Sequence, residues 1–137
     1  MEPGHVFERR VRLTPSDIVR FASDVGDTNP MHHDGAFAAT TRFGGLIASG
    51  AHTVAIAMAM CGSQASRDTP GVGLDFDFRL LGAAKPDEEI VFRWEVVSVE
   101  PSERPRGTIV SLRGEAIAEG ERPLLSATAR TLLVEKL

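Results

Sequence analysis

A short polar segment, residues 27–34, combines a carboxylate and an imidazole that could exchange protons with the same water molecule. Its sequence is DTNPMHHD, with Asp27 and His32 five residues apart. Pro30 keeps Asn29 out of the helical region of backbone conformation, so the segment is expected to turn. Because a turn folds the chain back, both side chains could reach one water, one as general base and the other as general acid. Asp27 and His32 are therefore the candidate catalytic residues.

Gly50 is a second candidate, because it comes directly before an apolar stretch that predicts a buried helix. A glycine lets a ligand approach the backbone closely, and the N–H groups at the start of a helix favour negative charge. The backbone at this position could therefore bind an oxygen atom on which charge develops during a reaction.

The other polar groups nearby have simpler interpretations. Asp34 is expected to cap a short helix, and His33 to contact solvent or the loop. His52, in the first turn of the apolar helix, could line a pocket or serve as a hydrogen-bonded structural histidine. A zinc site shared by Asp27 and the nearby histidines is disfavoured, because adjacent histidines point apart and no carboxylate or thiolate spacing supports it. No metal is expected.

Local signals place the polar turn directly after a helix. Residues 5–13 predict a weak first strand. Thr14 can cap the helix that follows, with Pro15 at its first position, and Gly26 can end it in the left-handed conformation. This helix delivers the chain to Asp27.

The apolar stretch from about residue 51 to 64 is apolar on every side. Such a helix is expected to be buried on all sides, and it is too short to cross a bilayer, which takes about 20 residues. Its two methionines, Met58 and Met60, are expected to be core residues first and a pocket wall second. Something in the same fold must wrap it.

The second half of the chain supplies that wrapper as period-two patterns. Strands are predicted at residues 72–80, 90–97, 109–118 and 123–134, with turns at Gly82 and Pro86, at residues 101–107 and at Gly120. Consecutive strands with short links are expected to be antiparallel neighbours, so one sheet should curl around the helix. The predicted class is α+β, with residues 1–137 forming a single domain.

Composition excludes several classes of function. The chain has 137 residues, a net charge of −4, one cysteine and no tyrosine. No positive field would attract nucleic acid or an anionic membrane, and Cys61, expected in the core, cannot form an internal disulfide, which fits the cytoplasm. Phosphate-binding loops, a nucleophile elbow and a Cys-x-x-Cys motif are all missing from the sequence.

These features resemble the MaoC-like hydratases and dehydratases, which include R-specific enoyl-CoA hydratases. The family pattern Asp-x-Asn-Pro-x-His-x-Asp is present without a gap at residues 27–34, and FGGLIASG at residues 43–50 precedes the apolar helix in the family's order. The resemblance covers nearly the whole chain. It implies a hot-dog fold, in which a curved antiparallel sheet wraps around a central helix.

The resemblance implies a cofactor-free lyase of fatty acid metabolism that reversibly hydrates a 2-enoyl-CoA to a 3-hydroxyacyl-CoA. Asp27 and His32 would hold and activate the water, and Asn29 would fix their loop. The N–H of Gly50 would bind the thioester oxygen. Ser49 stands where many members carry histidine, and the helix lacks a serine that several hydratases have; both departures concern substrate shape and reaction direction.

Two other functions are considered. A hot-dog acyl-CoA thioesterase usually places its carboxylate on the central helix, and residues 54–62 contain none. The second is a non-catalytic acyl-thioester binding subunit.

The expected substrate carrier is CoA or a carrier protein, and Arg42, Arg104 and Arg106 are available for CoA phosphates. A homodimer or a dimer of dimers is expected, because one curled sheet leaves edges and an apolar side exposed.

Overall fold

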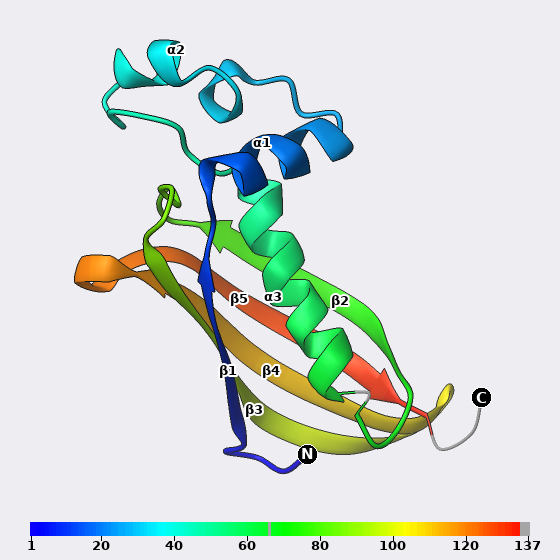
Figure 1. The fold of residues 1–137 in the computed structure, drawn as a ribbon. Helices are drawn as coiled ribbons and strands as arrows, with labels where there is room; N and C mark the ends of the chain where they lie inside the picture. The colour runs from blue at the N-terminus through cyan, green and yellow to red at the C-terminus, as the bar shows by residue number, and fades with distance from the viewer. Residues whose placement is uncertain (66, 135–137) are drawn as a thin grey trace.

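A five-stranded antiparallel sheet curves around one long helix (Figure 1). The computed structural model describes residues 1–65 and 67–134. In chain order the elements are β1 (Val6–Arg12), α1 (Pro15–Asp24), η1 (Pro30–His32), α2 (Gly35–Ala39), α3 (Gly50–Ala65), β2 (Gly71–Leu80), β3 (Glu89–Glu103), β4 (Arg106–Ala118), η2 (Glu119–Glu121) and β5 (Arg122–Leu133). The α+β prediction, with a sheet wrapped around the apolar helix, is confirmed.

The first helix forms as its end signals predict. Thr14 accepts from the N–H of Asp17 while the Asp17 carboxylate accepts from the N–H of Thr14, so both orphan donors are satisfied. Gly26 has a φ of 78°, the left-handed conformation expected of a residue that ends a helix. Asp34 caps α2 by accepting from the N–H of Phe37, again as predicted.

The core lies between α3 and the concave face of the sheet. Trp94 is almost fully buried there, and its indole N–H donates to the carbonyl of Ala57 on α3. Gly114 on β4 makes room for the indole, since a Cβ at this position would lie 2.6 Å from the Trp94 ring. Cys61 also faces the core, where burial raises the pKa of its thiol to about 12. The predicted core role of Cys61 is therefore confirmed.

The strand order is β1-β3-β4-β5-β2, which corrects the prediction that all consecutive strands are neighbours. β2 pairs with β5, and β3 pairs with β1 and β4. The link between β2 and β3, residues 81–88, is called the strap below. It cannot form a hairpin because it crosses the end of the sheet, with Ala84 buried in the core and the N–H of Asp87 bonded to the carbonyl of Leu13.

The turn predicted at residues 101–107 is present but shorter than expected. β3 continues to Glu103 and β4 begins at Arg106, so the connection is much tighter than the Pro and Gly residues suggest. Pro101 and Gly107 both lie in paired strands. A proline is tolerated here because β1 pairs with β3 only as far as Glu95, which leaves this stretch as a sheet edge.

α3 is not buried on all sides, contrary to prediction. Met58 is 40% exposed, and Ala51, Ala59, Gly62 and Ser63 are also exposed. A single curved sheet covers one side of a cylinder, so one face of α3 stays open within the chain. Nowhere in residues 1–65 and 67–134 is a helix long and apolar enough to cross a membrane.

Candidate active site

The polar turn is held by its own side chains. The N–H of Asp27 donates to the carbonyl of Ala22, so the turn is anchored to the end of α1. The Asp27 carboxylate accepts from the N–H of Asn29, and the Asn29 amide oxygen accepts from the N–H of Met31. Two successive side-chain-to-backbone bonds of this kind fix a turn without any packing partner. The Asn29 side chain therefore holds the backbone of the turn.

Asp27 and His32 face one another across a short gap. The Nε2 atom of His32 lies 3.4 Å from the Oδ2 atom of Asp27. The Nδ1 atom of His32 lies 2.7 Å from the carbonyl oxygen of Ile47. Because a carbonyl only accepts, Nδ1 carries a hydrogen and Nε2 is the position that gains or loses a proton. The pair can therefore pass a proton between Nε2, the carboxylate and a water at their edge.

The two groups differ in their access to solvent. The His32 side chain is 7% exposed, whereas the Asp27 side chain is 32% exposed. An imidazole locked in one orientation beside a carboxylate that reaches solvent is a suitable acid–base pair for a reaction with water.

A cavity of about 440 Å³ brings together four of the candidate residues, Asn29, His32, Ser49 and Gly50. Asp27 is not among the residues that line this cavity, but its carboxylate lies 3.4 Å from His32, which does line it. The remaining lining residues are Arg42, Phe43, Ile47, Ala48, Thr53, Leu80, Leu81, Gly82, Ala83 and Ala84. The remaining lining residues on the strap and on α3 belong to no recognisable sequence motif, so the sequence did not predict them as site residues. The turn signals at Gly82 and Pro86 are the one sequence feature that marks the strap.

The backbone at the start of α3 lines the cavity, and its N–H groups could bind a negatively charged oxygen. The buried Ser49 hydroxyl accepts from the N–H of His52, as an N-cap residue does. Gly50 opens the helix, and a Cβ there would lie 2.5 Å from a methyl carbon of Leu80. Since the glycine leaves that space to a flexible side chain, a ligand atom could approach the Gly50 backbone if Leu80 moves aside.

Two further polar residues of the turn have structural positions. The Nε2 atom of His33 lies 2.6 Å from the carbonyl oxygen of Asp27, the loop contact that the sequence predicted. In the described ranges, no three His, Cys, Asp or Glu side chains are grouped so that they could hold a metal ion.

The family model of the MaoC like domain matches residues 2–115. The chain belongs to the MaoC-like dehydratase family. A curated member, the 3-hydroxybutyryl-CoA dehydratase of Methylorubrum extorquens, is 32% identical over 127 residues, covering 88% of this chain and 78% of that protein.

Solved structures of R-hydratases share the fold of this MaoC-like chain. The unliganded R-hydratase PhaJ1 from Pseudomonas aeruginosa superposes with a TM-score of 0.85 at 24% identity, covering 99% of this chain and 84% of that chain. The (R)-hydratase from A. caviae involved in PHA biosynthesis gives 0.84 at 22% identity, covering 98% of both. The expected hot-dog fold is confirmed.

His52 has neither of the positions that the sequence left open. It does not line the site cavity, and among the residues that the structure describes its buried Nδ1 atom has no hydrogen-bond partner. Instead its ring stacks on Phe21 of α1, with centroids 4.2 Å apart and planes 6° from parallel. In this MaoC-like chain His52 therefore joins α1 to α3 by ring packing.

Burial lowers the pKa of His52 below its ordinary value of 6.5, opposed by the charge of Asp17 and reinforced by that of Arg20. The unfolded chain therefore binds a proton at this position more readily than the folded chain. The contribution of His52 to stability is fully present above about pH 6.5 and is lost as the pH falls through the lowered value.

We predict that His52→Phe, which keeps a ring on Phe21 but cannot be protonated, loses less stability on acidification than the wild type. The free energy of unfolding, measured in urea from about pH 7.5 to about pH 5, should fall less in the variant than in the wild type as the pH is lowered. Parallel curves for the two proteins would contradict this account of His52.

Proposed function

We propose that residues 1–137 form one hot-dog domain that catalyses the reversible hydration of a 2-enoyl-CoA to a 3-hydroxyacyl-CoA. The observation that carries the proposal is the contact between His32 and Asp27, with His32 in one cavity with Gly50. The family membership and the curated dehydratase among its relatives support it.

The reaction adds one water across the C2–C3 double bond. In the proposed mechanism the Asp27 carboxylate removes a proton from water as its oxygen bonds to C3. Protonated Nε2 of His32 gives its proton to C2, and the N–H of Gly50 stabilises the charge that develops on the thioester oxygen. The proton on Asp27 then passes to His32 across the 3.4 Å gap, which restores the starting state. Dehydration is the same sequence reversed.

The thioesterase alternative gains no support from the helix. α3 has the sequence GAHTVAIAMAMCGSQA, which contains no carboxylate that could activate water against a thioester carbonyl. The candidate carboxylate lies on the turn instead, next to an imidazole that can supply a proton to carbon.

Asp27→Asn and His32→Gln should each lower kcat for hydration of crotonyl-CoA by about 10²- to 10⁴-fold, the usual worth of a general acid or base. Loss of the enoyl absorbance measures the rate, and thiol release from butyryl-CoA measures any thioesterase activity. Asp24→Asn, which changes an exposed carboxylate at the end of the preceding helix, is the control and should keep the wild-type rate. An undiminished rate in Asp27→Asn would exclude the proposed base.

Arg42 supports CoA as the carrier of the acyl group. It is the formally charged side chain among the residues that line the site cavity, and its guanidinium lies 5.0 Å from the centre of the Phe43 ring. It makes no ion pair within the described part of the chain. Arg104 and Arg106 lie at the β3–β4 turn and do not line this cavity. We propose that Arg42 binds a phosphate of CoA.

Arg42→Gln should raise KM for crotonyl-CoA about tenfold, the worth of one charge-assisted hydrogen bond, and leave KM for crotonyl-pantetheine unchanged because that thioester has no phosphate. Arg104→Gln is the matched control and should alter neither value. Equal KM changes for the two thioesters in Arg42→Gln would show that Arg42 does not recognise phosphate.

The edge strand β2 supports the proposal of a homodimer or a dimer of dimers. Val72 and Leu74 are 50% and 41% exposed, and they share an apolar groove with Met58 of α3. Antiparallel pairing of β2 with β2 of a second copy, centred on Phe78, would set Asp77 opposite Arg79 of that copy. Both the open edge and the open side of α3 would then be covered.

Sedimentation velocity at micromolar concentration should give a dimer or a larger assembly for the wild type. Leu74→Lys should shift the species toward monomer, because it places a charge in the groove that a second copy would cover. Val97→Lys, at a position of β3 that is 51% exposed and does not line this groove, is the control and should sediment as the wild type does. A compact wild-type monomer would refute the oligomer.

A further inference from the structure

The strap forms a wall of the site cavity that has no polar side chains. Leu80 and the first four strap residues, Leu81, Gly82, Ala83 and Ala84, line the cavity together with His32 and Gly50. Because these side chains are small or aliphatic, the shape of the wall depends on where its backbone lies. Whatever fixes that backbone therefore fixes the width of the cavity.

Backbone hydrogen bonds hold the strap on both sides of Ala83. The N–H groups of Leu81 and Gly82 donate to the carbonyl of Leu124, and the carbonyl of Ala84 accepts from the N–H of Ala48. The carbonyl of Ala83 itself is bound by a side chain, the Nη1 atom of Arg122, at 2.9 Å.

Arg122 is held in turn by Glu88 at the other end of the strap. Its Nη2 atom contacts both carboxylate oxygens of Glu88, one at 2.7 Å, and one of these oxygens also accepts from the N–H of Lys85. The Glu88 side chain is only 10% exposed, and that of Arg122 is 34% exposed. A guanidinium can hold a carboxylate with one nitrogen and a carbonyl with another, which the single ammonium of lysine cannot do in the same geometry.

We infer that Glu88 and Arg122 are positioning residues, whose ion pair fixes the carbonyl of Ala83 and with it the strap wall of the site cavity. The inference rests on the function proposed above, because it assigns the pair to substrate binding at that site. Neither residue touches the proposed acid–base pair, so the role is to place the wall and not to transfer protons.

The strap is also hydrogen-bonded to the segment that leads into α3, where the N–H of Gly50 is proposed to bind the thioester oxygen. Ala84 accepts from the N–H of Ala48, which is followed directly by Ser49 and Gly50. A strap released from Arg122 would both widen the cavity and loosen the backbone that leads into α3. Misplacement of a binding wall by about 1 Å is enough to change catalytic efficiency strongly.

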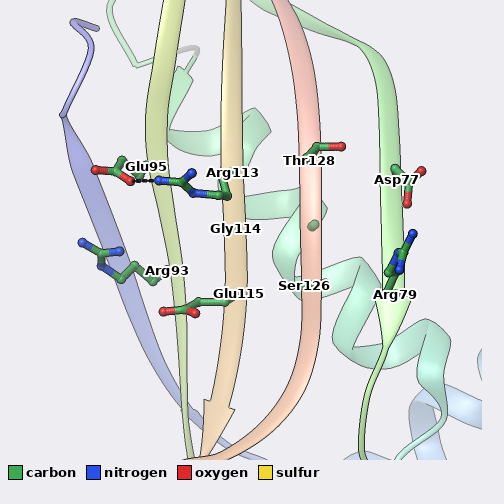
Figure 2. Close-up of a pocket in the computed structure, with 10 residues that line it drawn as sticks. Asp77, Arg79, Arg93, Glu95, Arg113, Gly114, Glu115, Ser126 and Thr128 are labelled. Carbon is green, nitrogen blue, oxygen red and sulfur yellow. Dashed lines mark hydrogen bonds and ion pairs between the residues drawn. The ribbon is translucent and has the colours of Figure 1, made fainter.

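An exposed ion pair elsewhere in the sheet provides a matched control. Arg113 donates to Glu95 at 2.8 Å across the outer face of the sheet, with the Arg113 side chain 68% exposed (Figure 2). Figure 2 shows both side chains on the face opposite to α3, among other charged residues of neighbouring strands. This pair has the same chemistry as Glu88–Arg122 but no contact with the site cavity.

The decisive variant is Arg122→Lys, which keeps the positive charge but lacks the two nitrogens that bind the Ala83 carbonyl and the Glu88 carboxylate at the same time. We expect KM for crotonyl-CoA to rise on the order of tenfold, while the pH dependence of kcat stays that of the wild type because Asp27 and His32 are unaltered. Arg113→Lys should leave both unchanged. All rates are measured well below the unfolding temperature of each variant and per folded molecule.

Hydrogen–deuterium exchange of the same proteins gives a readout that does not depend on activity. Peptides covering residues 46–50 and 81–88 should exchange faster in Arg122→Lys than in the wild type and in Arg113→Lys, with the remaining sheet unchanged.

The outcomes separate this inference from the proposed function. An active wild type with an unchanged KM in Arg122→Lys overturns the inference, as does faster exchange spread over the whole sheet, which would indicate a purely structural pair. A wild type inactive on every enoyl-CoA refutes the proposed function instead. In that case, faster exchange confined to the two peptides still supports the positioning of the wall, and unchanged exchange overturns it.

Discussion

The packing of one apolar helix on the concave face of one sheet is the constraint on which the rest of this structure depends. Trp94 and its hydrogen bond to the carbonyl of Ala57 fix the position of α3 along the sheet as well as its distance from it. Fixing α3 also fixes the position of the N–H groups at its start. These groups lie at the cavity that the polar turn and the strap also line.

The site is assembled around this helix start from three separate segments. The turn after α1 supplies Asp27 and His32, which depend on local hydrogen bonds and on the carbonyl of Ile47. The segment through Ser49 supplies the cap of α3. The strap arrives from the far edge of the sheet and is tied down by Arg122. Each segment has a different physical basis, namely turn hydrogen bonds, helix capping and an ion pair.

Features that depend on neighbouring residues were predictable from the sequence. Thr14 with Asp17 and Asp34 with the start of α2 form caps within four residues, and the dyad lies within one turn. Features that depend on distant partners were not. That β2 pairs with β5 follows from the path of the strap over the core, and the stack of His52 on Phe21 follows from how α1 meets α3. Pro101 gave a misleading turn signal because its tolerance in β3 depends on where β1 ends.

The bond between His32 and the carbonyl of Ile47 has a consequence for how such a site can diversify. Ile47 lies only three residues before Gly50, so the carbonyl that orients the imidazole and the start of α3 belong to one short, continuous stretch of backbone. The strap wall belongs to a different stretch and carries no polar side chain facing the cavity. Under the proposed function, substitutions in the strap are therefore expected to change which acyl groups are accepted more than proton transfer between Asp27 and His32, whose mutual contact and anchor at Ile47 lie outside the strap.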